Sequence, residues 1–170
     1  MNRPISLALL AVALLLGACR PQAAGTTPTP NLAPSDDAAV AVDALVTFFD
    51  HLQEGSYAAA AGYYGGSYEV LQGYNPDVGP DDYATLWRNA CSVNGISCLK
   101  TGKLTLVDRS REGEYVFGVE FRTREGELFV LGPCCGADET EQPPVSVFPI
   151  RVVRGDDGRY RVVDIPPFTP

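Results

Sequence analysis

A stretch of alternating side chains in the C-terminal half constrains the fold most. Large apolar residues occupy every second position from Tyr115 to Phe121, while the charged residues Glu114, Glu120 and Arg122 mark the other face. A period of two is typical of a β-strand with one buried face. Such a strand needs another layer of structure to cover its apolar face, so the rest of the chain must supply that layer.

The alternation continues through the C-terminal half and predicts an antiparallel meander. Glycine-containing turns at 111–113, 124–126 and 155–158 separate the apolar runs, and Pro166-Pro167 ends the last one. A long loop over 132–144 interrupts the meander. We expect strands near 98–106, 115–121, 128–131, 145–153 and 160–165.

The N-terminal half has a helical period instead. Ser35 is suited to cap a first helix and Gly55 to end it. The apolar residues that share one face of this helix are Ala41, Leu45, Phe48, Phe49 and Leu52. Ser56 is suited to cap a second helix over 57–64, and Asp81 or Asp82 a further one that ends near Asn94. Residues 67–74 fit either a short strand or one helical turn.

Helices followed by antiparallel strands predict an α+β fold, in which the N-terminal helices pack on one face of a sheet of four to six strands. We assign residues 1–18 to a signal peptide, 19–35 to a flexible linker and 36–170 to a single domain. The linker is rich in proline, threonine and small residues, which favour an extended chain.

The first 18 residues have the features of a secretory signal. Arg3 is charged, the run from Ile5 to Leu16 is apolar, and Gly17-Ala18 are small residues at the end of that run. The apolar run is about 12 residues long, whereas a helix that spans a bilayer needs about 20. We therefore expect a cleaved signal peptide rather than a transmembrane helix.

The segment from Leu16 to Cys19 resembles the cleavage box of bacterial lipoproteins. The resemblance implies that cleavage follows Ala18 and that Cys19 carries lipid chains, two or three of which anchor a protein stably. The implied location is extracytoplasmic, on the cell membrane or an outer membrane. An ordinary signal peptide followed by an incidental cysteine is the alternative. The sequence LGPCCG, residues 131–136, also resembles a group of bacterial lipoproteins without an assigned activity.

Residues 46–60 resemble the start of nuclear-transport-factor-2-like domains. In that family a first helix ends before glycine, a small residue and tyrosine, and an aromatic pair follows, here Tyr63-Tyr64. The resemblance implies a cone-shaped fold whose curved antiparallel sheet encloses a pocket with the helices. Some members are isomerases or dehydratases, and many only bind or mediate assembly. Their acid or histidine base has no counterpart in this chain, although Asp164 is the one acid of the late strands that could point inward.

Four cysteines follow Cys19, namely Cys91, Cys98, Cys134 and Cys135. Export favours disulfides. Adjacent Cα atoms lie about 3.8 Å apart, whereas disulfides usually need about 4.4–6.8 Å. If all four are paired, Cys91 and Cys98 must each bond to one member of the adjacent pair, and we expect this arrangement. The alternatives are a single Cys91–Cys98 bridge with a redox dithiol, a vicinal disulfide that acts as a switch, and a zinc or copper(I) site with poor ligand spacing.

The expected function is a non-catalytic binding or interaction module for an envelope protein or a hydrophobic small molecule. The chain has one histidine, His51, and we identify no nucleophile motif, metal site or cofactor site. Its net charge of −8 argues against a nucleic-acid partner. The residues that we consider as pocket lining or core are Tyr63, Tyr64, Tyr68, Trp87, Tyr115 and Phe117.

Two alternative functions stay open, an isomerase- or hydrolase-type enzyme in the same fold and a thiol-redox protein that uses Cys134-Cys135. An apolar cavity without a convergent acid–base pair would favour the binding module. An inward carboxylate beside a tyrosine would favour the enzyme, and exposed unpaired sulfur atoms would favour the redox protein.

Overall fold

The computed structural model describes residues 36–111 and 113–169. The expected signal peptide, the Cys19 anchor, the linker and the Ser35 cap lie outside the described residues. All described residues belong to one unit of the chain, Leu32–Pro170. No helix among the described residues has the length and apolar character that crossing a membrane requires.

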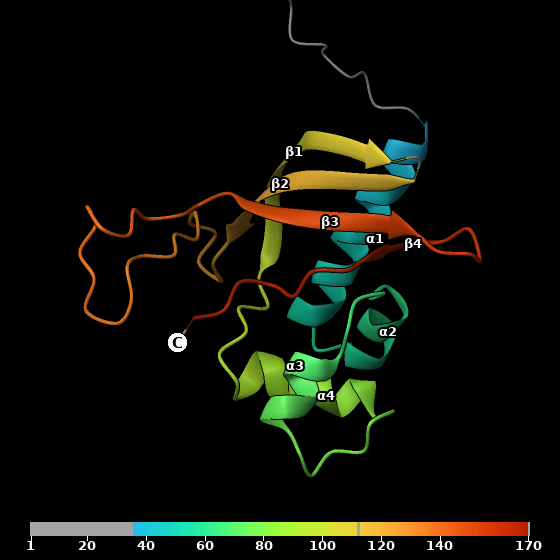
Figure 1. The fold of residues 1–170 in the computed structure, drawn as a ribbon, viewed down its shortest axis with the longest axis horizontal. Coiled ribbons are helices and arrows are strands. Elements are labelled where there is room, and N and C mark those ends of the chain that lie inside the picture. Colours follow the sequence, from blue (N-terminus) through green and yellow to red (C-terminus); the bar gives the residue numbers. More distant parts are fainter. Residues whose placement is uncertain (1–35, 112, 170) are drawn as a thin grey trace, which may run out of the picture. The chain divides into compact units, whose positions relative to one another are not determined.

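The fold is α+β, with the helices first and the strands after them (Figure 1). Four strands form one open, curved, antiparallel sheet in the order β1-β2-β3-β4. The elements are α1 (Asp36–Gln53), α2 (Tyr57–Gly62), α3 (Glu69–Tyr74), α4 (Tyr83–Ser92), β1 (Lys100–Arg111), β2 (Glu114–Arg122), β3 (Phe148–Arg154) and β4 (Tyr160–Val162). This confirms the fold class expected from the sequence.

The core lies between α1 and the sheet, and α1 crosses the strands in Figure 1. The rings of Phe49 on α1 and Phe121 on β2 have centroids 4.8 Å apart, and both side chains are fully buried. The predicted apolar face of α1 and the predicted apolar face of β2 therefore pack on each other. Burial of one such large side chain contributes about 1.5–3 kcal/mol, so this contact stabilises the fold.

The ends of the helices follow from local chemistry. Gly55 has φ +78°, and the N–H of Ser56 donates to the carbonyl of His51 at 2.8 Å, which ends α1 as expected. The Asp82 carboxylate accepts the N–H of Thr85 at 3.1 Å and caps α4. Ser56 occupies the N-cap position of α2, as expected, but its side chain makes no capping hydrogen bond. Residues 69–74 form the helix α3, which decides between the strand and the helix considered above.

The expected strand over 128–131 is absent. This segment makes only isolated bridges, between Arg122 and Leu128 and between Leu131 and Val145. Proline lacks a donor and glycine weakens strands, so Gly132-Pro133 and Pro143-Pro144 prevent the bridges from extending into a ladder. Consequently β3 begins at Phe148 rather than at residue 145, and the side chains of Leu128 and Val130 are exposed.

The helical half is attached to the sheet along β4. Val162 donates its N–H to the carbonyl of Tyr63 at 2.9 Å and accepts the N–H of Gly65 at 2.8 Å. At the opposite edge, β1 pairs only with β2 among the described strands. The last residues return to the connection between α4 and β1, where the N–H of Thr169 donates to the carbonyl of Gly95 at 2.7 Å.

Candidate functional site

An apolar groove lies between the first turns of α1 and the strands β1 and β2. Its volume is about 330 Å³, which is at the lower end of the range for small-molecule sites. We call it the α1–β1 groove. It is lined by Ala38, Ala39, Val42, Leu104, Leu106 and Phe117, and no charged side chain belongs to this lining.

The sequence explains why this space is not filled. Leu106 pairs with Phe117 across the β1–β2 ladder, so both side chains project toward α1. The first turn of α1 presents small alanines at 38 and 39, whereas the later turns present leucine and phenylalanine. Small side chains opposite leucines leave room beside the edge strand. Register shifts along β1 add bends to this edge, as β-bulges generally do.

The six aromatic residues selected from the sequence do not meet in one cavity. Only Phe117 lines the α1–β1 groove, and only Tyr63 lines the larger cavity described below. Tyr64, Trp87 and Tyr115 are core residues with exposed fractions of 5%, 0% and 0%. The groove residues from α1 and β1 were missed because alanine, valine and leucine at core-compatible spacing give no signal of their own.

The aromatic group formed by Tyr64, Tyr68 and Trp87 is structural. The Trp87 indole Nε1–H donates to the Tyr68 hydroxyl at 3.2 Å, and the Tyr64 hydroxyl donates to the carbonyl of Ser67 at 3.0 Å. Burial raises the pKa of Tyr64 to about 12 and also raises the pKa of Tyr68. Both phenols are therefore neutral hydrogen-bonding groups. The bond from Trp87 joins α4 to Tyr68 at the start of α3, and the bond from Tyr64 fixes the segment before it.

A second cavity, of about 530 Å³, lies between α1, the end of α2 and the β3–β4 turn. Asp43, Arg159 and Tyr160 are among its lining residues, and the hydroxyl oxygen of Tyr160 is buried. The enzyme alternative requires a carboxylate that points inward next to a tyrosine, and Asp43 is the one acid in this lining. The side chains of Asp43 and Arg159 are not buried, however, so they lack the desolvation that usually tunes a catalytic acid or base.

Asp164 and His51 also lie outside the α1–β1 groove. Asp164 accepts from the Arg151 guanidinium at 2.6 Å and from the Arg151 backbone N–H at 2.7 Å. The hydrogen bonds and charge of Asp164 raise the pKa of Arg151. Together the two side chains form an ordinary surface ion pair. The His51 ring lies 5.7 Å from the Tyr63 ring, and its Nδ1 has no hydrogen-bond partner in the described part of the chain.

The cysteines differ from the expected arrangement. Cys91 is bonded to Cys98, with a Cα–Cα distance of 5.4 Å, and Cys134 and Cys135 are free thiols. The expectation that Cys91 and Cys98 each bond to the vicinal pair is therefore wrong for this structure. The physical reason is local, because α4 ends at Ser92 and the positive φ of Gly95 turns the chain back toward Cys91. The turn residues Asn94-Gly95 between the two cysteines are the sequence signal for this pairing.

Comparison of the sequence with protein-family models gave no match, and comparison with curated proteins gave none either.

Proposed function

We propose that this protein is a membrane-tethered, extracytoplasmic binding module that takes an apolar small molecule in the α1–β1 groove. The observation that carries the proposal is the groove itself, with six apolar side chains and no acid–base pair in its lining. The signal-like N-terminus and the lipoprotein-like box at Cys19 support the tether. The Cys91–Cys98 disulfide supports export, because disulfides persist mainly in oxidising compartments.

The groove predicts how affinity depends on the ligand. Burial of one CH₂ group contributes about 0.8 kcal/mol, which changes Kd about fourfold. In a series of straight-chain alcohols, Kd should fall about fourfold for each added methylene until the groove is full. Each alcohol is added to the full chain with a fluorescent apolar probe bound, and its Kd is obtained from displacement of the probe. An affinity that does not depend on alkyl length would contradict the proposal.

A matched pair of substitutions locates the binding. Ala39→Phe places a ring in the groove from an exposed position of α1, so the fold should be retained. Ala58→Phe makes the same change at an exposed alanine of α2, outside the groove. We expect Ala39→Phe to weaken probe and alcohol binding at least tenfold and Ala58→Phe to leave it unchanged. Equal effects of the two substitutions would place the site elsewhere.

The tether is tested separately at Cys19. Cells that express the full chain are supplied with an alkyne-labelled fatty acid, and membranes are separated from soluble material. We expect the wild type to be labelled and to remain in the membrane fraction, and Cys19→Ser to lose the label and become soluble. Membrane association that survives this substitution without the label would argue for an anchor other than a lipidated Cys19.

A second candidate function, a thiol-redox protein, is favoured by one observation, the free thiols of Cys134 and Cys135. Redox catalysts usually lower the pKa of the attacking thiol. Here the hydrogen bond with Cys134, followed by the charge of Cys134, raises the pKa of Cys135. We therefore expect the full chain to reduce a model disulfide slowly, at a rate close to that of the Cys134→Ser variant.

A further inference from the structure

The two free thiols lie in a well-defined turn of the 132–144 loop. The carbonyl of Cys134 accepts the N–H of Ala137 at 3.0 Å, and the two residues between them, Cys135 and Gly136, have φ values of 60° and 87°. Positive φ at both central positions corresponds to a type I′ turn. The N–H of Cys134 also donates to the Gln142 side chain at 2.9 Å. The backbone that carries both sulfur atoms is therefore held from two sides.

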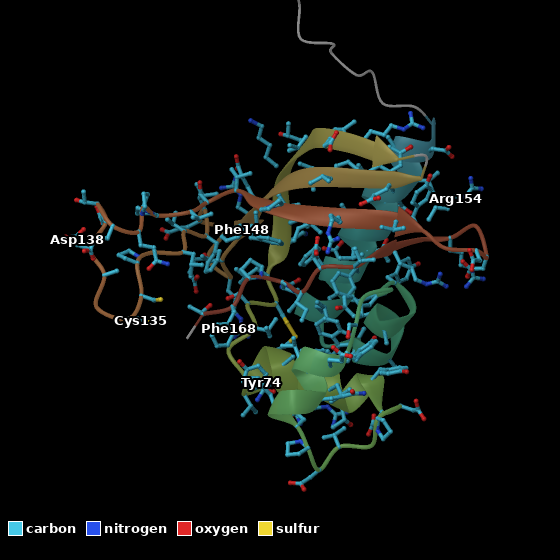
Figure 2. All side chains as sticks on the ribbon, viewed as in Figure 1. Tyr74, Cys135, Asp138, Phe148, Arg154 and Phe168 are labelled. Carbon is cyan, nitrogen blue, oxygen red and sulfur yellow. A yellow bond between two sulfur atoms is a disulfide. The ribbon has the colours of Figure 1, made fainter. Side chains whose placement is uncertain are left out.

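Both thiols border the same small, mainly apolar spaces. One cavity, of about 250 Å³, is lined by Leu131, Gly132, Cys134, Cys135, Gln142 and Phe168. A second, of about 400 Å³, also includes both cysteines, together with residues 130–133 and Thr169. Figure 2 shows Cys135 on the side of the loop that faces the C-terminal segment with Phe168. Both cysteines thus line the same two cavities, with Cys134 half-buried and Cys135 exposed.

The charge of this loop selects among possible ligands. Residues 132–144 include three acids, Asp138, Glu139 and Glu141, and no lysine, arginine or histidine. Negative surroundings disfavour any complex in which two thiolates leave a net negative charge. A ligand whose complex with two thiols is uncharged is therefore favoured.

Common thiophilic ions meet this condition to different degrees. Structural zinc takes four ligands, and no group of three or more potential ligands is assembled in the described part of the chain. Copper(I) between two thiolates gives a complex with net charge −1. Trivalent arsenic or antimony is pyramidal, accepts two neighbouring sulfur atoms and one hydroxyl, and forms a neutral product.

We propose that Cys134 and Cys135 form a chelating dithiol site for a trivalent thiophilic metalloid of the arsenous acid class. Arsenous acid exchanges two of its three hydroxyls for the two sulfur atoms. Two S–H and two As–O bonds break, two As–S and two O–H bonds form, and two water molecules leave without transfer of an electron. Leu131 and Phe168 line the same cavity and can contact an organic substituent on the metalloid.

The test uses the full chain with Cys19→Ser in every sample, so that Cys134 and Cys135 are the free thiols. The protein is titrated with phenylarsine oxide, and in a second series with arsenite, while Cys134 and Cys135 are reduced and the Cys91–Cys98 disulfide is intact. Free thiols are counted with a chromogenic disulfide, and the intact mass is measured. We expect one arsenical per chain, loss of both titratable thiols, resistance to a monothiol and release by a dithiol such as 2,3-dimercaptopropanol.

Matched variants separate chelation from simple thiol reactivity. Cys135→Ser leaves one thiol, and Cys135→Ser combined with Ala58→Cys restores two thiols per chain at separated positions. We expect both variants to bind the arsenical at least 100-fold more weakly than the protein that retains both Cys134 and Cys135. All three proteins should unfold at the same urea concentration, because the substituted positions are exposed.

Several outcomes would overturn the proposal. These are equal binding by the variant with separated thiols, release of the arsenical by a monothiol, and one arsenical shared by two chains. Competition by Zn(II) or Cu(I) at equal concentration would indicate a different ion. A pair that closes to a disulfide in the presence of the reductant would indicate a redox device instead. These results do not depend on the α1–β1 groove, so the two proposals can fail separately.

Discussion

Removal of the Cys91–Cys98 disulfide should have a moderate effect on stability that can be calculated from its short loop. The two cysteines are seven residues apart. In the chain-entropy model, a cross-link over a loop of this length stabilises the folded state by about 2.5 kcal/mol. The alternative bridges from this pair to the 132–144 loop would close loops on the order of 40 residues and would contribute about 4 kcal/mol each. The size of the effect therefore distinguishes the two pairings.

The assay is urea unfolding of the full chain, followed by fluorescence of Trp87, the single tryptophan, which is fully buried. Cys91→Ala with Cys98→Ala should lower the free energy of unfolding by about 2.5 kcal/mol. The m value should rise slightly because the denatured chain expands without the cross-link. Treatment of the wild type with a reductant should give the same shift.

The matched control is Cys134→Ala with Cys135→Ala. Because these thiols are unbonded and lie in a surface loop, the change in the free energy of unfolding should stay within about 0.5 kcal/mol. The Cys91–Cys98 pairing would be refuted if this control lost as much stability as the Cys91/Cys98 variant. It would also be refuted if removal of Cys91 and Cys98 cost about 4 kcal/mol or more, as a long loop predicts.

Three further predictions concern a core side chain, a helix cap and the ionisation of a buried tyrosine. Phe49→Ala should lower the free energy of unfolding by about 3–5 kcal/mol in urea, because it leaves a cavity against Phe121 in a fully buried position. Asp82→Ala should cost about 1 kcal/mol in the same assay through loss of the α4 cap, and Asp82→Asn should restore most of it. Burial raises the pKa of Tyr64 to about 12 from 10.0, so the unfolded chain ionises first and stability should fall as the pH rises from about 10 to 12. Tyr64→Phe should flatten that part of the curve of unfolding free energy against pH, and an unchanged slope would contradict this assignment.

The class of fold and the faces that form its core are encoded in the order of the residues. Periodicity decides which side of an element is apolar, and apolar faces must be covered, so Phe48, Phe49, Phe117 and Phe121 are enough to identify the packing faces of α1 and β2. The same pattern predicted a strand over residues 128–131, which is wrong, because an apolar run alone does not indicate whether a partner strand lies close enough to pair with it. The glycines and prolines that flank this run prevented the pairing.

The candidate sites, in contrast, depend on the folded chain. The α1–β1 groove exists because alanines at 38 and 39 lie opposite Leu104 and Leu106. Contacts between residues so far apart in the chain cannot be inferred from the sequence pattern. The choice of disulfide partners likewise depended on how the chain turns at Gly95, which placed Cys91 and Cys98 together and left Cys134 and Cys135 free. Local periodicity is a property of neighbouring residues, whereas cavities and cross-links depend on distances that only tertiary packing sets.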